Sequence, residues 1–324
     1  MKVLPVILLL FFEVYSISGK TGPLKLNLVS RRLLDGLLDG LGFLAYRDVS
    51  FTLYTRSCSN QVIGLNDTKS LMTSNFNSSH PIRFVIHGWV NNDNSEINKL
   101  ITSAYHSVGD FNVFIVDWGA FDEYSRAASQ VDPVGETVAD FLIFLRKETG
   151  IRLSDVTVIG HSMGAHIAGV TGRNTAKVEE LGVIVGLDPA LPMFDTKFSA
   201  SRLTGSDAKY VETMHTNIYS WGIGPPIGTA SFYPNYGKKQ PGCILDIIQV
   251  CSHNQAYKYF AESITSKKGF WARRCQGYDD ITKKSCISSG EDVLMGGEPS
   301  NVKSEGVYWL KTNMFPPFAK GELV

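Results

Sequence analysis

The sequence has no excess of charge of either sign. Its 324 residues include 31 lysines and arginines and 31 aspartates and glutamates, so the formal net charge is zero. Without a broad basic field or an acidic tail, binding to nucleic acid is not expected. The chain is 44% hydrophobic, which is enough for a sizeable core, and α/β folds of this length often form one domain.

Long apolar runs are also missing, apart from one at the N-terminus. Met1 and Lys2 precede VLPVILLLFF, which is too short to span a bilayer, and the small residues of VYSISG follow. This order predicts a cleaved signal peptide at residues 1–18 in preference to a buried helix, and hence a secreted, extracellular protein. Residues 19–46, with a loose helical period in RRLLDGLLDGLGFL, are expected to form a pro-segment or a surface helix, and residues 47–324 the main domain.

Cysteine is scarce, and the absence of a C-x-x-C motif argues against a cysteine-bound metal. Cys243 lies close in the chain to Cys251, as Cys275 does to Cys286. Two local disulfides are therefore the economical pairing in an oxidising compartment, although other pairings stay open. Cys58 is left over, either as a buried thiol or as an intermolecular partner.

Two sequons fit a secreted chain. They begin at Asn66, in NDT, and at Asn77, in NSS. Such triplets also arise by chance, so each asparagine is a candidate glycosylation site.

Alternating strand and helix patterns predict the fold class. Four short runs are β-branched and almost continuously apolar, as strands of a parallel sheet covered on both faces should be: Ile82–Ile86, Asn112–Val116, Val156–Ile159 and Val183–Leu187. Between the second and third runs, apolar residues recur with a helical period at Val134, Val138, Phe141, Leu142 and Leu145. This order predicts right-handed crossovers and a mostly parallel α/β sheet with helices on both faces.

The stretch VIGHSMGAH, residues 158–166, contains a G-x-S-x-G motif around Ser162. The motif alone is weak, because a chain with 30 glycines has many glycine-rich turns. Here it lies where a predicted strand ends and a helix-compatible segment, residues 165–170, begins, which is the context of a nucleophile elbow. Gly160 and Gly164 lack the Cβ atoms that would collide there, and the strained turn lifts the hydroxyl of Ser162 above the sheet edge.

A serine nucleophile needs a general base, and in elbow hydrolases an orienting acid and then a histidine follow the serine in the chain. The candidates after the acid are His215 and His253. His215 lies in YVETMHT, which alternates as a strand does, and is more typical of a core histidine. His253 follows a cysteine and precedes a predicted helix, so we expect it on a disulfide-anchored loop, where catalytic bases are common.

Asp188 is the candidate orienting acid. It ends the predicted strand VIVGL and precedes Pro189, which puts it at the carboxyl edge of a parallel sheet, where α/β folds bind ligands. Asp188 could instead have a structural role, because an aspartate before proline is common in turns. Asp195, Asp207 and Asp246 are other candidates for the orienting acid. None of the rivals directly follows a buried strand, which favours Asp188.

The oxyanion of an acyl-transfer intermediate needs two N–H donors. Met163 is expected to supply one at the start of a helix, where the helix dipole also favours negative charge. The segment IHGW, residues 86–89, offers the other: a strand end, a glycine and then Trp89, whose amide can point inward. Even if the ring of Trp89 serves only for packing, its backbone N–H can still donate to the oxyanion.

Motifs along the chain resemble the pancreatic lipase family in the same order. They cover roughly Phe51 to the C-terminus and are FVIHGW, VDW, GHSMGAHIAG, GLDPA, SDAKYVETMHT, FYPN, PGC and CSHNQAYKYF. The resemblance implies an α/β-hydrolase fold with a catalytic triad of Ser162, Asp188 and His253. These are the same three residues that the motifs and their spacing favour.

The sequence departs from that family in its length and loops. Two-domain members continue into a C-terminal β-sandwich that binds a protein cofactor, whereas this chain ends at Val324, so neither that domain nor a colipase is expected. The disulfide-bounded lid of those lipases is long, but ILDIIQV at residues 244–250 is short, and the loop at 217–231 also looks shortened. Both features resemble secreted insect-type phospholipases A1 and related digestive lipases.

The family's calcium site matches only in part. Arg202 and Asp207 fit the pattern, but Ser199 and Thr204 stand where carboxylates are expected, and hard cations prefer carboxylate oxygens. No metal and no cofactor are therefore expected.

These features imply a lipid-acting serine esterase at a lipid–water interface, with peripheral membrane contact only. The favoured function is a phospholipase A1 that releases the sn-1 acyl chain through an acyl-enzyme. A triacylglycerol or galactolipid lipase is the main alternative, and a non-catalytic lipid-binding member of the family is another. The apolar residues of the predicted lid contact the lipid surface or, equally, form a small buried strand: Ile244, Leu245, Ile247, Ile248 and Val250.

Overall fold

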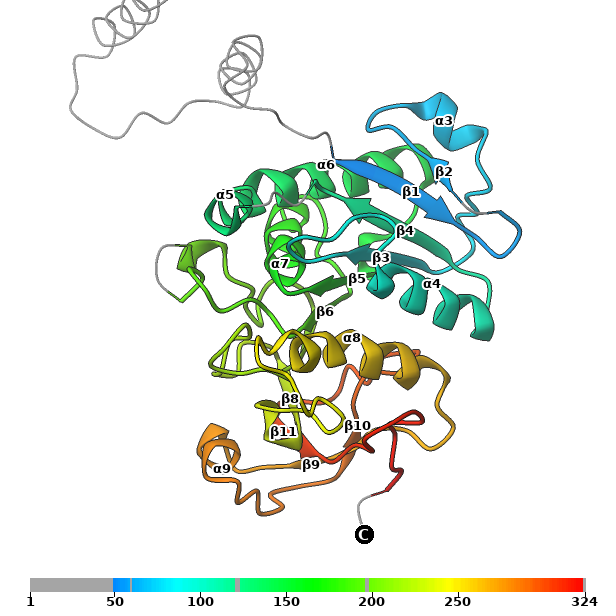
Figure 1. The fold of residues 1–324 in the computed structure, drawn as a ribbon. Coiled ribbons are helices and arrows are strands. Elements are labelled where there is room, and N and C mark those ends of the chain that lie inside the picture. The colour runs from blue at the N-terminus through cyan, green and yellow to red at the C-terminus, as the bar shows by residue number, and fades with distance from the viewer. Residues whose placement is uncertain (1–48, 59, 120–122, 196–197, 323–324) are drawn as a thin grey trace, which may run out of the picture. The chain divides into compact units, whose positions relative to one another are not determined.

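The computed structural model describes residues 49–58, 60–119, 123–195 and 198–322 (Figure 1). The predicted signal peptide and the segment 19–46 lie outside the described residues. Within the described part, the strands form one mixed sheet in the order β10-β9-β11-β8-β7-β6-β5-β3-β4-β1-β2. None of the helices in these ranges is long and apolar enough to cross a membrane.

Parallel strands form the middle of the sheet. They are β3 (Ile82–Ile86), β4 (Asn112–Asp117), β5 (Val156–His161), β6 (Val183–Leu187), β7 (Tyr210–Met214), β8 (Ala230–Pro234) and β11 (Gly306–Leu310). Antiparallel strands lie at both edges: β1 (Ser50–Tyr54), β2 (Gln61–Val62), β9 (Trp271–Arg274) and β10 (Val293–Leu294). The predicted strands are confirmed as β3 to β6, although β4 and β5 run slightly further than predicted.

Helices cover both faces of this sheet (Figure 1). They are α3 (Thr68–Met72), α4 (Glu96–Val108), α5 (Tyr124–Ser129), α6 (Val131–Thr149), α7 (Met163–Thr175), α8 (Val250–Thr265) and α9 (Tyr278–Lys283), with short 3₁₀ turns at Leu153–Asp155, Ser199–Ser201 and Asn235–Gly237. Buried side chains of α6 and α7 belong to one core cluster, and those of α4 and α8 to a second cluster on the other face. This is the α/β-hydrolase fold that the motifs predicted.

The helical period predicted for residues 134–148 is confirmed by α6. All five apolar residues named for that period are buried in the helix. The helix ends at Gly150, whose φ of 72° is a left-handed conformation that glycine adopts without a Cβ clash. The chain can then turn back into β5, which leads to the serine motif.

Both predicted disulfides are present. Cys243 is bonded to Cys251, and Cys275 to Cys286. Cys58 takes part in neither disulfide. It is half-buried, whereas the first of the two alternatives for this residue was a buried thiol. Because Cys251 belongs to the first turn of α8, the first disulfide fixes both ends of the short loop between its cysteines.

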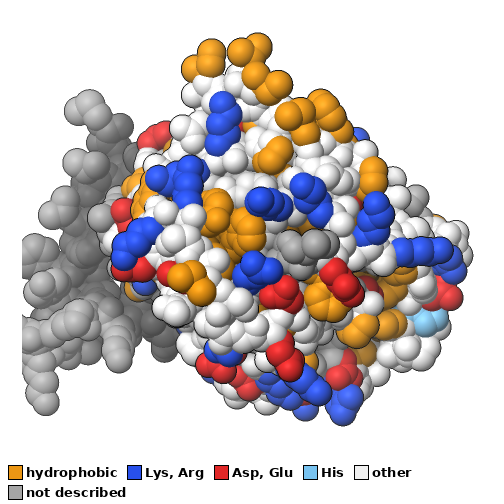
Figure 2. All heavy atoms as spheres, turned by 90° about the horizontal axis from the view of Figure 1, so that it is seen from below, with side chains coloured by type: hydrophobic (Ala, Val, Ile, Leu, Met, Phe, Trp, Pro, Cys, Tyr) orange, Lys and Arg blue, Asp and Glu red, His pale blue; other side chains and the backbone are white. Residues whose placement is uncertain are grey.

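One face of the molecule carries charges of both signs. Figure 2 shows Lys and Arg side chains interspersed with Asp and Glu, and hydrophobic side chains in small groups between them. This mixture matches the zero net charge of the chain. No field of a single sign covers this face, so it does not select ligands by charge.

Glu212, a buried acid in β7, should make stability depend on pH. Its Oε1 accepts the N–H of Gly296 at 2.7 Å, and burial raises its pKa from the ordinary value of 4.5 to about 7. The folded state therefore binds more protons than the unfolded state between these two values. The contribution of Glu212 to stability is therefore greatest below about pH 4.5. As the pH rises from there through about 7, the free energy of unfolding falls by about 3 kcal/mol.

Replacing Glu212 with glutamine should remove this loss, because an amide occupies the same space without ionising. Urea unfolding of both proteins at about pH 4.5 and about pH 7.5 measures the difference. An equal pH dependence in the two proteins would contradict the role assigned to Glu212.

Candidate active site

Ser162 lies at the turn between β5 and α7, as predicted. Its backbone has φ 56° and ψ −121°, a conformation that costs a non-glycine residue about 1–3 kcal/mol. The N–H of Ser162 donates to the carbonyl of Leu187 at 3.0 Å, and its own carbonyl accepts the N–H of Ala190 at 3.2 Å. These bonds fix the serine beside the end of β6, where Asp188 follows.

Gly160 and Gly164 are points of close backbone approach. A Cβ on Gly160 would lie 2.1 Å from the carbonyl oxygen of Gly164, and a Cβ on Gly164 would lie 2.3 Å from that of Ile86. The second contact differs from the prediction, because Gly164 approaches the end of β3 and not β5. Together the glycines let α7 begin against the sheet, which keeps Ser162 at the carboxyl edge.

Asp188 is fully buried directly after β6. Its Oδ1 accepts the backbone N–H groups of Thr216 and Asn217, at 2.8 and 3.0 Å. Its Oδ2 lies 2.5 Å from Nδ1 of His253. A Cβ on Gly222 would lie 2.4 Å from Oδ1, so this glycine leaves room for the carboxylate. The N–H donors hold the carboxylate in place and aim its other oxygen at the histidine.

The rival acids have other surroundings. Asp195 is exposed, and Asp207 pairs with Arg173 at 2.7 Å. Asp246 accepts two backbone N–H groups of α8. Asp188, in contrast, combines complete burial with a contact to the candidate base.

The predicted loop position of His253 is wrong. His253 lies in the first turn of α8, which begins at Val250. The helix begins before the histidine because the carboxylate of Asp246 accepts the N–H groups of Cys251 and Ser252, at 2.9 and 2.8 Å. These N–H groups have no acceptor within the helix, so the aspartate stabilises its first turn. A rigid helix turn, and not a loop, therefore carries the candidate base.

His161 precedes the candidate nucleophile and contacts the candidate base. The ring centroids of His161 and His253 are 4.5 Å apart, and His161 Nε2 lies 3.2 Å from the carbonyl oxygen of His253. Burial holds the pKa of His161 well below its usual range. The His161 ring therefore stays neutral and adds no positive charge beside His253. These contacts also bring the segment of Ser162 next to that of His253.

His215 occupies a core position with both ring nitrogens engaged. Nδ1 lies 2.9 Å from the carbonyl oxygen of Ile223, and Nε2 lies 2.9 Å from the hydroxyl of Thr213. The ring stacks on Tyr233 with centroids 4.5 Å apart, and burial lowers the pKa of His215 to about 4. These are the properties of a structural histidine.

Met163 and Trp89 belong to the two backbone segments next to Ser162. Met163 is the first residue of α7, so its N–H has no acceptor within the helix. Trp89 follows Gly88, where a Cβ would lie 2.9 Å from the Cβ of Ser162. The turn after β3 thus runs against the serine, which is the placement that an oxyanion hole requires. The ring of Trp89 also packs on Tyr124, with centroids 5.1 Å apart.

Sequence reasoning missed several residues of the site. Thr216 and Asn217 hold Asp188 through backbone N–H groups, which any residue type supplies, so the sequence carries no signal for them. Asp246 could have been found, because an aspartate shortly before a predicted helix is a common capping residue. His161 could also have been found from its place inside the serine motif.

The predicted lid is an exposed loop, and the alternative of a small buried strand is wrong. The exposed fractions of Ile244, Leu245, Ile247 and Ile248 are 69%, 89%, 89% and 70%. The chain passes through successive turns here, because the disulfide and the early start of α8 leave no extended stretch for strand pairing. Val250 belongs to α8 and is 38% exposed. We refer to residues 244–249 as the 244–249 loop.

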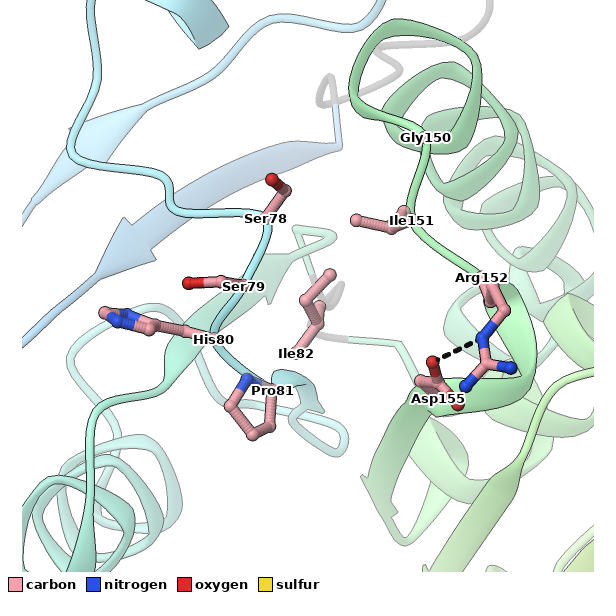
Figure 3. A pocket seen from close by; sticks show the side chains of 9 residues that line it. All are labelled: Ser78, Ser79, His80, Pro81, Ile82, Gly150, Ile151, Arg152 and Asp155. Carbon is pink, nitrogen blue, oxygen red and sulfur yellow. Dashed lines mark hydrogen bonds and ion pairs between the residues drawn. The ribbon is translucent and has the colours of Figure 1, made fainter.

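The hollow drawn in Figure 3 lies at the other end of the strands. Its volume is about 640 Å³, and it is lined by residues 78–82, residues 150–152 and Asp155. Ile82 begins β3 and Asp155 directly precedes β5, so the hollow lies at the amino edge of the sheet. The ion pair of Arg152 with Asp155, at 2.8 Å, forms part of its wall (Figure 3). The hollow is therefore separate from the site around Ser162.

The residues at the family's calcium position do not fit a calcium ion. The Oδ2 of Asp207 pairs with Arg173 at 2.7 Å and accepts the N–H of Thr204 at 2.8 Å. Its Oδ1 accepts the hydroxyl of Thr204 at 2.9 Å. Both carboxylate oxygens thus already face donors, one of them a permanent cation, whereas calcium needs several acceptor oxygens.

Comparisons with known proteins agree with this architecture. Residues 44–318 match the family model described as Lipase. Pancreatic lipase-related protein 2 of Myocastor coypus is 34% identical over 263 residues, which cover 73% of this chain and 56% of that protein. Pancreatic triacylglycerol lipase of Cavia porcellus is 34% identical over 77% of this chain and 59% of that protein. The human pancreatic triacylglycerol lipase is 35% identical over 73% of this chain and 56% of that protein.

The chain therefore spans little more than half the length of these relatives. The matched region includes the serine turn, the buried aspartate and the helix that carries His253. Because the family model covers most of the chain, this protein belongs to the lipase family.

Proposed function

We propose that the protein is a carboxylic ester hydrolase that acts on lipids, with Ser162 as nucleophile, His253 as general base and Asp188 as orienting acid. The observation that carries the proposal is the 2.5 Å contact between Asp188 Oδ2 and His253 Nδ1, formed next to a serine in a strained turn between strand and helix. A serine, a histidine and a buried acid with these roles are the machinery of acyl transfer.

The first step forms an acyl-enzyme. Nε2 of His253 takes the proton of the Ser162 hydroxyl as its oxygen attacks the ester carbonyl, and Asp188 stabilises the imidazolium that results. The N–H groups of Met163 and Trp89 donate to the oxyanion of the tetrahedral intermediate. The C–O bond of the ester then breaks, and the leaving alcohol takes the proton from His253.

The second step regenerates the enzyme. His253 takes a proton from water, the hydroxide attacks the acyl-enzyme carbonyl, and the same N–H groups stabilise the second oxyanion. Collapse of this intermediate releases the fatty acid and returns the proton to Ser162. Buried His161 stays neutral throughout, so the charge beside Asp188 is the imidazolium alone.

The substrate class that we propose is a phospholipid cleaved at the sn-1 position, as by a phospholipase A1. The short, exposed 244–249 loop supports this choice, because it covers less of the site than a long lid and leaves room for a bulky headgroup. A triacylglycerol lipase is the second candidate. The observation in its favour is the similarity to proteins named pancreatic triacylglycerol lipase.

We also propose that the 244–249 loop contacts the lipid surface. Its four aliphatic side chains are 69–89% exposed, and a group of exposed apolar side chains is costly in water but favourable at a membrane. Replacing Ile247 and Ile248 with serine should weaken sedimentation with phosphatidylcholine vesicles. Unchanged sedimentation would remove the membrane contact from the proposal.

Secretion is part of the same proposal. It is supported by the signal-like N-terminal sequence and by two disulfides, which persist in oxidising compartments. Asn66 and Asn77 are both exposed, so glycans could be attached without unfolding the protein. A mass loss of the secreted protein on treatment with a peptide N-glycosidase is the expected result, and no loss would exclude both sites.

The test of substrate class compares the secreted protein with Ser162→Ala on doubly labelled phosphatidylcholine and on triolein. We expect release of the sn-1 chain, and a loss of at least about 10⁴-fold in the variant, because the nucleophile is gone. Hydrolysis of triolein alone would identify a triacylglycerol lipase. Hydrolysis of neither substrate would overturn the proposed enzyme and favour a lipid-binding role.

A further inference from the structure

Three successive peptide groups in the turn after β3 are held by side-chain donors. The carbonyl oxygen of His87 accepts the Nε1–H of Trp118 at 2.9 Å. The carbonyl oxygen of Trp89 accepts an Nδ2–H of Asn91 at 3.0 Å. Between these two groups, the carbonyl oxygen of Gly88 lies 2.9 Å from Nδ1 of His87. The direction of each peptide group is therefore set by a side chain, in a stretch that lies outside any strand or helix.

The ring of His87 faces an acceptor at each of its nitrogens. Nδ1 faces the carbonyl oxygen of Gly88, and Nε2 lies 3.1 Å from Oδ1 of Asp117, the last residue of β4. The hydrogen bond from His87 lowers the pKa of Asp117, so this carboxyl is ionised at neutral pH and can only accept. His87 is fully buried, and a neutral ring would set a nitrogen lone pair against one of the two acceptors. Both nitrogens therefore carry a proton, and the ring is an imidazolium paired with Asp117.

The rings on the neighbouring strand ends add no charge beside His87. Trp118 stacks on the His87 ring with centroids 5.7 Å apart. His161, at the end of β5, is neutral, because burial and, to a smaller extent, the charges of His253 and His87 hold its pKa well below the usual range. The carboxylate of Asp117 therefore keeps the second proton on His87 without competition from these rings.

The hydrogen bond at the Gly88 carbonyl fixes the direction of the Trp89 N–H. The two groups belong to one planar trans peptide, in which C=O and N–H point in opposite directions. Because the oxygen is turned to the buried ring of His87, the N–H of Trp89 points away from that ring. Gly88 lies against the nucleophile, since a Cβ on it would be 2.9 Å from the Cβ of Ser162. A peptide rotated by half a turn would exchange the N–H for a carbonyl oxygen, which repels an oxyanion.

We infer that His87 and Asp117 are positioning residues for the oxyanion hole, because the His87 imidazolium holds the Gly88 carbonyl and so aims the N–H of Trp89 at the oxyanion. The inference rests on the proposed function and adds two residues to its machinery, on the other side of β5 from Asp188. His87 neither touches the substrate nor exchanges a proton in either acyl-transfer step. A donor that is already aligned needs no reorganisation when charge develops, so this hydrogen bond contributes to kcat and not to KM.

The first test is His87→Phe, which keeps a ring beside Trp118 but has no N–H to donate. On a soluble ester, kcat should fall about 10- to 100-fold, less than for outright loss of an oxyanion donor, while KM stays within about 2-fold. His87→Asn should recover most of this loss, because its NH₂ group can take the place of Nδ1 and donate to the same carbonyl. His106→Phe, at a half-buried histidine in the last turn of α4, is the control and should keep the wild-type kcat. A wild-type kcat for His87→Phe, or equal losses in His87→Phe and His87→Asn, would overturn the inference.

A trifluoromethyl ketone separates oxyanion binding from a general effect on the shape of the site. The Ser162 oxygen bonds to its carbonyl carbon, the C=O electron pair moves to the oxygen as an oxyanion, and the serine proton passes to His253. An ether of the same chain length binds without forming this charge. In His87→Phe, the Ki of the ketone should rise by the factor lost in kcat/KM, and the Kd of the ether should not change. Equal changes for the two ligands would overturn the inference.

Nitrogen NMR of the wild type with isotope-labelled histidine tests the hydrogen bond without relying on a variant that folds. The ring signals that are missing from His87→Asn, or from His87→Phe, identify His87. Both of its ring nitrogens should be protonated at about pH 7, and an unprotonated Nδ1 would overturn the inference. If the wild type hydrolyses no ester, the proposed function fails and the inference falls with it. An active wild type with an equally active His87→Phe removes the inference alone.

Discussion

Replacing Asp188 with asparagine should lower kcat by about 10⁴-fold while the protein stays folded. The two backbone N–H groups that face Oδ1 require an acceptor there, so the amide oxygen takes that place and the NH₂ group faces His253. Nδ1 must then accept a hydrogen bond, which puts the ring proton on Nε2, the nitrogen that we propose takes the proton of Ser162. A protonated Nε2 cannot take the serine proton, so catalysis is lost through the wrong tautomer.

The matched control is Asp195→Asn, at an exposed aspartate shortly after β6. Its kcat should stay within about 2-fold of the wild type, as expected for a surface substitution. Initial rates on a soluble ester and thermal unfolding curves of both variants make the comparison. A wild-type rate for Asp188→Asn would contradict the assigned acid, and a large loss for Asp195→Asn would make that residue the better candidate.

Replacing Gly164 with alanine should unfold or strongly destabilise the domain. The new Cβ would lie 2.3 Å from the carbonyl oxygen of Ile86 and 2.7 Å from that of His87. Both are backbone atoms at the end of β3, so neither can move without shifting the sheet. We expect a loss of about 3 kcal/mol or more and a Tm lower by about 6 °C or more.

Gly277→Ala provides the control for this substitution. Gly277 has an extended backbone with φ −179°, and a Cβ there would meet no atom within 4 Å. Calorimetry should therefore find its Tm close to that of the wild type. Equal Tm values for Gly164→Ala and the wild type would mean that the turn at Ser162 does not depend on close packing against β3.

Local patterns were enough to predict four neighbouring strands of the central sheet, β3 to β6, and the serine turn. The strand β3 was predicted with its observed bounds because both of its faces are buried, so all of its residues except Arg83 are apolar. Ser162 was predicted because the crowding at its flanking glycines leaves a mark on the sequence itself. Asp188 was predicted because it ends a buried strand at the carboxyl edge.

Features that depend on contacts between distant segments could not be predicted. The start of α8 before His253 is not one of these features, because it depends on Asp246, only five residues before Cys251, and a local capping pattern could have indicated it. The donors to Asp188 are backbone N–H groups at 216 and 217. The bond between Trp221 and Ile248 joins two loops that show no shared pattern in the sequence. Such contacts follow from tertiary structure, which periodicity and motifs do not encode.

The most direct test of the catalytic role proposed for Ser162 is to trap the nucleophile. The secreted protein is incubated with a p-nitrophenyl alkylphosphonate, which bonds covalently to an activated serine, and the modified peptide is identified by mass spectrometry. We predict one adduct, on Ser162, that forms with loss of activity and is absent from Ser162→Ala. An adduct on another residue, or full activity of a protein in which Ser162 has been replaced, would contradict the proposed mechanism.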